Sequence, residues 1–366
     1  MKKVILNFLI LTLFAFTSHA QLNVYRLPMD SNATVKGFTV RYALPTTALK
    51  MTVTVDKVRE YKGYYSDYAS SLLGLSNVIN ENKTYYKLQK VSVSPVEVPD
   101  FTHAYLIIPS SEQSKSGFFN DMVTEKGLVP DLNNVSCYQT KTQAMSDFFK
   151  NYADLTYTQT EDAFVETKII DGVVTQVPSN RTKTVSKTNE QQAKEAADAI
   201  GKSRKDQYAL AAGEQETPYS AETIQIMLKE LKQWENNYLS LFTGLVLEDE
   251  MEYTFYVIPN PDSPTPAFAL NLEKGFSSDV QSAKDEDLYT IQVSPVFPHS
   301  FETSAVPTDK GTGYCYRMAQ PATVTLNHLQ KCIHNFGTLE LRQLGPIQAL
   351  PKMQNNLDIK KIGFIF

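Results

Sequence analysis

The sequence contains few of the residues on which covalent or cofactor chemistry usually depends. It has 3 cysteines, 5 histidines and 1 tryptophan among 366 residues. It lacks the Gly-x-Ser-x-Gly, His-Glu-x-x-His and Rossmann glycine patterns of common enzymes. Gly201-Lys202-Ser203 matches the end of a nucleotide-binding loop, but Ala196 stands where that loop needs its first glycine. The sequence therefore predicts no catalytic residue and no cofactor.

Long apolar runs are also scarce, and the exception lies at the N-terminus. Two lysines precede an apolar run over residues 4–16, and Ser18-His19-Ala20 places small residues where a signal peptidase reads them. The run is shorter than the ~20 residues of a membrane span. We therefore predict a signal peptide over 1–20 and cleavage between Ala20 and Gln21. The mature chain would be periplasmic or extracellular, without a membrane span.

An excess of positive charge is absent as well. The formal net charge is −5, and removal of the two lysines of the signal peptide makes it about −7. Nucleic acids and anionic membrane surfaces are both bound by clustered Lys and Arg side chains. We therefore expect neither as the main ligand. The hydrophobic content of 42% is ample for packed cores.

The chain has three cysteines, so one disulfide bond would leave one cysteine unpaired. Cys315 and Cys332 are the closer pair and form a candidate disulfide bond, with Cys137 unpaired; three unpaired, buried cysteines are the alternative. Cys315, His328, Cys332 and His334 are also a candidate zinc site, because zinc prefers these ligand types. Surface histidines beside a core or disulfide cysteine are the competing interpretation.

Two parts of the chain predict β structure. Residues 49–58 alternate between apolar and polar as a half-buried strand does, with a loop expected at Pro45-Thr46-Thr47. Short strands separated by Pro and Gly turns return after the middle of the chain. We expect an N-terminal β-rich domain over 21–140 and a C-terminal β-rich domain over 246–366. The sequence leaves open whether they form one unit.

The region between them, 141–245, predicts a β-hairpin and two long helices. Asp171-Gly172 suits a type I′ turn, and residues 178–187 are expected to be a linker or an exposed connection. Thr188 and Gln191 form a capping-box pattern that begins a helix. The second helix starts near Ser220 and carries a heptad-like apolar stripe that is expected to be buried, which consists of Ile224, Met227, Leu231, Trp234, Tyr238 and Leu241.

The expected fold is therefore α+β, with two sandwich-like β-rich lobes and an antiparallel helical hairpin between them in sequence. Four tyrosines crowd one short segment, namely Tyr61, Tyr64, Tyr65 and Tyr68. Exposed aromatic rings stack on sugars, so this segment is a candidate glycan-stacking face. Packing over a strand layer is the alternative.

Four segments in order along the chain carry a family resemblance: residues 63–75, 239–244, 316–322 and 344–351. Together they resemble an uncharacterised bacterial exported family, domain of unknown function 4831. The resemblance implies an exported protein of Gram-negative bacteria, and it implies no activity.

The function expected from these observations is non-catalytic binding or scaffolding at the cell envelope. The partner would be an envelope protein or a glycan, and a protein partner would lie along the helical hairpin or an exposed sheet edge. The competing class is a secreted enzyme, in particular a glycan hydrolase that uses two facing carboxylates.

Overall fold

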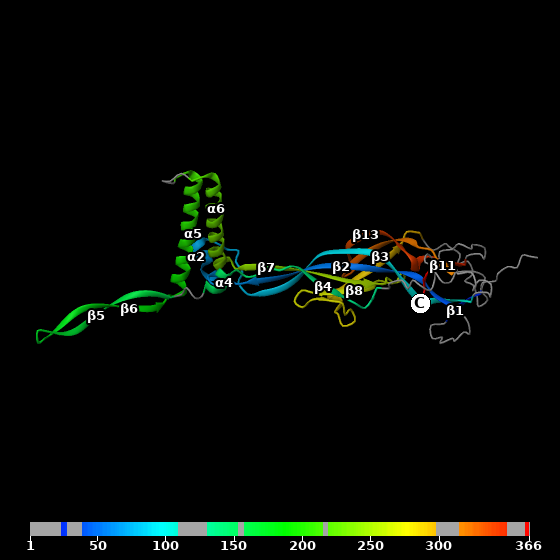
Figure 1. Ribbon diagram of the computed structural model, residues 1–366, viewed down its shortest axis with the longest axis horizontal. Coiled ribbons are helices and arrows are strands. Elements are labelled where there is room, and N and C mark those ends of the chain that lie inside the picture. Colours follow the sequence, from blue (N-terminus) through cyan, green and yellow to red (C-terminus); the bar gives the residue numbers. More distant parts are fainter. Residues whose placement is uncertain are drawn as a thin grey trace, which may run out of the picture.

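The computed structural model describes residues 23–27, 39–108, 130–152, 157–214, 219–297, 315–349 and 363–365. The chain is elongated (Figure 1). Two packed sheets form one end, and a helical hairpin with a two-stranded ribbon forms the other. The expected α+β class is confirmed, because a pair of long helices separates β-rich regions along the chain.

The first sheet is antiparallel and has six strands among the described residues. In sheet order they are β1 (Asn23–Leu27), β3 (Lys83–Ile108), β2 (Val40–Tyr61), β7 (Leu245–Val257) and β4 (Ser136–Lys141), with β15 (Phe364–Ile365) also beside β2. The central strand β2 is continuous for 22 residues, which is roughly 70 Å at the rise of an extended chain. It therefore connects the two ends of the molecule.

The second sheet packs face to face on the first. Its order is β13 (Lys331–Leu341), β12 (Gln320–His328), β10 (Leu288–Pro295), β8 (Thr265–Asn271) and β9 (Gly275–Ser277). Alternate side chains of β2, among them Leu49, Met51 and Val53, are fully buried against Ile291 and Val324 of the second sheet. The β-rich regions before and after the helices therefore share one core, which settles the question that the sequence left open.

The loop expected at Pro45-Thr46-Thr47 is wrong, because this stretch lies inside β2 and is buried. It runs beyond the pairing with β7, beside the short helix η5 (Arg342–Leu344) and the small sheet of β11 (Cys315–Arg317) and β14 (Ile347–Ala349). Gln343 bonds both the N–H and the carbonyl of Thr47, at 3.0 and 3.1 Å. The stretch pairs with β3 on one side, and these hydrogen bonds satisfy the backbone of Thr47 on the other side, which β7 does not reach.

The helical hairpin forms as its capping signals predict. Helix α5 spans Asn189–Ala212 and α6 spans Ala221–Thr243. The Thr188 hydroxyl accepts a hydrogen bond from the N–H of Gln191 at 3.2 Å, and the Gln191 side chain accepts one from the N–H of Thr188 at 3.0 Å. At α6 the Ser220 hydroxyl accepts a hydrogen bond from the N–H of Thr223 at 3.2 Å. The local sequence thus fixes where both helices begin.

A second core fixes the root of the hairpin to the end of β2. It includes η1 (Ser66–Tyr68), α2 (Ala69–Leu73) and α4 (Asp147–Asn151), packed around Tyr65 and Phe242. The N–H of Tyr65 donates to the carbonyl of Leu241 at 2.7 Å. The hydroxyl of Tyr65 donates to Gln192 of α5 at 2.9 Å. Both long helices are therefore anchored at the same point.

A two-stranded ribbon extends from this root, away from the sandwich (Figure 1). Strands β5 (Tyr157–Ile170) and β6 (Val173–Ser186) pair along their whole length. The φ angles of Asp171 and Gly172 are 52° and 82°, as the predicted type I′ turn requires. The prediction of a linker at 178–187 is wrong, because residues 178–186 belong to β6 and pair with β5.

Close packing at the root can be tested with two glycines. A Cβ atom at Gly63 would lie 2.5 Å from the carbonyl oxygen of Leu241, which is backbone and has no room to move. We expect Gly63→Ala to lower the free energy of unfolding by about 1–3 kcal/mol. Gly201, inside α5, meets nothing within 4 Å, so Gly201→Ala should raise it by about 0.5–1 kcal/mol. Denaturant unfolding measures both, and equal effects would contradict this packing.

Candidate binding groove on the helical hairpin

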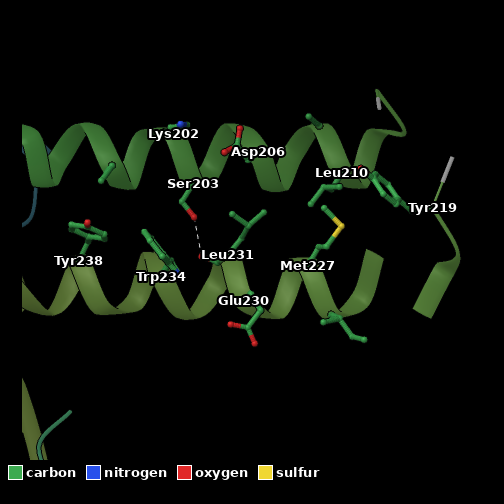
Figure 2. A pocket seen from close by; sticks show the side chains of 13 residues that line it. Lys202, Ser203, Asp206, Leu210, Tyr219, Met227, Glu230, Leu231, Trp234 and Tyr238 are labelled. Atoms are coloured by element: carbon green, nitrogen blue, oxygen red, sulfur yellow. Dashed lines mark hydrogen bonds between the residues drawn. The ribbon is translucent and has the colours of Figure 1, made fainter. Parts of the chain in front are cut away.

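A groove of about 840 Å³ runs along one side of the helical hairpin. Figure 2 shows its lining: Leu210, Leu231 and Trp234 lie between the two helices, whereas Glu230 points away from α5. Helix α5 contributes Ala199, Lys202, Ser203, Asp206, Ala209 and Leu210. Helix α6 contributes Ile226, Met227, Glu230, Leu231, Trp234 and Tyr238, and Tyr219 comes from the segment just before this helix. Most of this surface is apolar, and its charged residues come from both helices.

The groove exists because the two helices present side chains of unequal size. At this level α5 has the small residues Ala199 and Ser203, whereas α6 has large apolar ones at heptad-like spacing. The hydroxyl of Ser203 donates a hydrogen bond to the carbonyl of Leu231 at 2.8 Å, drawn as a dashed line in Figure 2. The helices therefore approach closely, and the larger side chains of α6 emerge beside the contact.

The predicted apolar stripe is buried only at its C-terminal end. Leu241 is fully buried in the root core, whereas Trp234 is 60% exposed and the other stripe residues are only partly buried. Helix α5 offers Lys202 and Asp206 to the groove, where burial of the stripe would need apolar side chains. The expectation of one continuous buried seam is therefore wrong, since α5 is too polar to cover it.

A buried carboxylate fastens the two helices beside the groove. The side chain of Glu235 is only 5% exposed and accepts hydrogen bonds from Arg204 at 2.8 Å, Lys232 at 2.9 Å and Gln207 at 3.0 Å. The hydrogen bonds from Arg204 and Lys232 lower the pKa of Glu235 to about 2. Sequence analysis missed this residue. The available signal was its position four residues after Leu231, which places both on the same face of α6.

The four candidate glycan-stacking tyrosines do not form one exposed face. Tyr65 is buried, and Tyr61 and Tyr68 pack against the root core. Tyr64 is 47% exposed, and its ring lies 5.3 Å from that of Phe149. The crowded segment therefore packs the root of the hairpin and leaves one ring, that of Tyr64, about half exposed.

The three cysteines are free thiols in the structure, and the proposed bond between Cys315 and Cys332 is not formed. Cys315 is buried on β11, whereas Cys332 is exposed on β13 and belongs to a different sheet. Cys137 is exposed on β4, so only one of the three is buried.

The four candidate zinc ligands are not gathered into one site either. Among the described residues, no group of three or more His, Cys, Asp or Glu side chains is placed to hold a metal ion. His328 stacks on Tyr289 and lies 2.8 Å from the carbonyl of Glu286, and His334 contacts Phe336. Burial raises the pKa of the Cys315 thiol, which disfavours the thiolate that binds metals.

The remaining predictions concern membrane spans and the signal peptide. Over the part of the chain that the structure describes, no helix has the length and apolar character needed to cross a membrane. The cleavage site predicted between Ala20 and Gln21 lies outside the described residues.

The contribution of Glu235 to stability should depend on pH. A carboxyl whose pKa is lowered by folding stabilises the folded state above its unfolded pKa of 4.5, and this stabilisation disappears as the pH falls towards about 2. We expect Glu235→Gln to lower the free energy of unfolding at neutral pH by about 1–2 kcal/mol, because the exposed cations are partly screened. Glu230→Gln, at an exposed position of the same helix, is the matched control.

The measurement is denaturant unfolding of both variants and the wild type across this pH range. The difference in free energy of unfolding between the wild type and Glu235→Gln should shrink as the pH falls below about 4.5. If this difference stays constant down to about pH 2, the stabilisation does not come from the ionised carboxylate.

Comparison with known proteins gives a family and no activity. No curated protein and no solved structure matches the chain. A family model described as a domain of unknown function (DUF4831) matches residues 38–361, a range that includes the sandwich, the ribbon and the helical hairpin. This match covers most of the chain. The protein therefore belongs to the DUF4831 family.

Proposed function

We propose that this protein is exported to the cell envelope and acts there by binding, without catalysis, and that the groove between α5 and α6 receives an amphipathic helix of a partner protein. The observation that carries the proposal is the position of Trp234. It is the only tryptophan of the chain and lies 60% exposed in an apolar groove between two anchored helices. Buried tryptophans at the centre of an interface contribute strongly to affinity.

The shape of the groove favours a helix as its occupant. Two antiparallel helices of 24 and 23 residues offer a track roughly 35 Å long. A third helix with apolar residues three and four positions apart would cover Met227, Leu231 and Trp234 and complete a three-helix bundle. Lys202 and Asp206 on one helix and Glu230 on the other would favour one orientation of the partner.

The groove is also held in shape before any partner arrives. Its helices are joined by the bond from Ser203 to Leu231 and by the hydrogen bonds of Glu235, and their root is packed around Tyr65. A surface that is already ordered loses less conformational entropy on binding. The hairpin projects to one side of the long strands, clear of the sandwich (Figure 1), which leaves room for a partner along it.

The alternative of a carboxylate-based glycan hydrolase has less support. Each of the three buried carboxylates of the described residues is engaged by other side chains. Glu235 is bonded to Arg204, Asp249 forms an ion pair with Arg59 at 2.9 Å, and Asp56 accepts a hydrogen bond from Gln89. Such contacts hold structure, whereas hydrolysis needs two acids that face a shared cleft.

Export can be tested on the protein as its own cells produce it. We expect the mature protein in the periplasmic or extracellular fraction, with residues 1–20 removed and Gln21 as its first residue. Intact-mass measurement and N-terminal sequencing identify the cut. Ala20→Phe should leave the precursor uncut, because the peptidase needs a small residue there. Recovery of the wild type with Met1 or Lys2 at its N-terminus, in the cytosol, would contradict the proposal.

Binding in the groove can be tested by photo-cross-linking in the same cells. A photoreactive residue in place of Met227 should give a discrete adduct with one envelope protein. The same residue at Lys229, an exposed position about 200° around α6 from Met227, should not. Trp234→Glu should abolish the adduct, since loss of a central tryptophan contact weakens binding about 30-fold or more.

The cross-linking experiment needs one structural control, because a collapsed hairpin would also lose the adduct. Circular dichroism of the purified Trp234→Glu variant should show unchanged helix content. Equal adducts from both positions, or an adduct that survives Trp234→Glu, would contradict the groove as the binding surface.

A further inference from the structure

In the part of the chain that the structure describes, the ribbon of β5 and β6 has two unpaired strand edges and several exposed apolar side chains. Within the described residues its two strands pair only with each other. Val165, Ile169 and Val174 are 60%, 73% and 67% exposed. A lone two-stranded ribbon is at best marginally stable in water, and each open edge is a template for another strand.

Three of the exposed apolar side chains lie on one face of the ribbon, whereas Val173, which is 64% exposed, lies on the other. Ile169 is directly opposite Val174, and Val165 is directly opposite Pro178. Because side chains alternate between the two faces of a strand, Val165 and Ile169 share a face, which Val174 joins from β6. Glu166 and Lys168 lie on the other face, where they form an ion pair at 3.0 Å.

The turn determines which backbone groups point to the open edges. In a hairpin with a two-residue turn, the flanking pair, here Ile170 and Val173, exchanges hydrogen bonds, and every second pair does so after it. The N–H and C=O groups of Val165, Thr167 and Ile169 therefore point to the free edge of β5. On β6 the outward positions include Pro178, which has no N–H to donate. Addition of a strand is thus hindered at β6 and open at β5.

We propose that the free edge of β5 pairs with β5 of a second copy of this chain, antiparallel about a two-fold axis at Thr167. In this register Val165 faces the partner's Ile169, and Glu166 faces the partner's Lys168. The sequence from 165 to 169, apolar-acidic-Thr-basic-apolar, is complementary to itself when it is reversed. The product is a closed, four-stranded sheet in the order β6-β5-β5-β6.

Charge selects this register over its neighbours. Moving the axis by one residue in either direction, to Glu166 or Lys168, places two glutamates or two lysines directly opposite each other. Like charges opposed across an antiparallel pair are destabilising, whereas opposite charges stabilise it. The paired ribbons would also place Val165, Ile169 and Val174 of both copies on one continuous apolar face.

The test is the oligomeric state of the mature full-length protein, followed by sedimentation velocity across a concentration series. The wild type should show a concentration-dependent monomer–dimer equilibrium. Glu166→Lys and Lys168→Glu should each weaken the dimer about tenfold or more, because both cross-strand pairs become repulsive. Gln176→Lys, on the outward edge of β6, is the matched control and should leave dimerisation unchanged.

Mixing the two single variants separates pairing between copies from damage within one ribbon. Each variant alone has like charges along its own strand and opposite its own copy. In a mixed pair, every residue 166 faces an opposite charge at residue 168 of the other chain. We therefore expect heterodimers that form about as tightly as the wild-type dimer. A wild type that stays monomeric, a dimer that tolerates both single reversals, or a mixture that forms no heterodimer would overturn the proposal.

Discussion

The antiparallel pairing of the long strand β2 is the interaction on which the rest of the structure depends. Its residues from Leu49 to Glu60 pair with β3 on one side and with β7 on the other. The same strand supplies Leu49, Met51 and Val53 to the sandwich core and ends at the root that holds Tyr65 against Leu241. Chain segments on either side of the helical hairpin are thereby joined in one sheet, although nearly 200 residues separate β2 from β7.

This arrangement separates the packed body of the protein from the two surfaces that we propose bind other chains. The apolar side chains of the sandwich are turned inward in two layers. In contrast, apolar side chains of α6 and of the ribbon are exposed to water, among them Trp234, Ile169 and Val174. Exposed apolar surface of this kind is unfavourable in isolation and marks places where another molecule binds. The groove suits a helix, and the edge of β5 suits a strand, so the two proposed contacts do not compete.

Sequence reasoning succeeded where the controlling contacts are local. The hydrogen bonds between Thr188 and Gln191, and the positive φ angles of Asp171 and Gly172, involve residues at most three positions apart. The α+β class followed from the alternation over residues 49–58, from the later short strands and from the helical spacing over residues 224–241. These features depend little on the remainder of the chain, so their patterns can be recognised without it.

Sequence reasoning failed where the structure of a residue depends on contacts with residues far away in the chain. Pro45-Thr46-Thr47 has the composition of a loop but pairs with residues 97–99 of β3, and Gln343, almost 300 residues later, forms hydrogen bonds to the other side of Thr47. The stripe on α6 has the spacing of a buried seam, but whether Trp234 is covered depends on which residues of α5 face it. Glu235 is buried because Arg204 and Gln207 lie opposite on the other helix.

The most direct test of the central claim is hydroxyl-radical footprinting of the protein in the envelope of its own cells and after purification. Trp234 should be oxidised readily in the purified protein and protected in the envelope. Tyr208, which is 69% exposed on α5 and lies outside the groove lining, should be labelled equally in both. Equal labelling of Trp234 in the two preparations would contradict a partner bound in the groove.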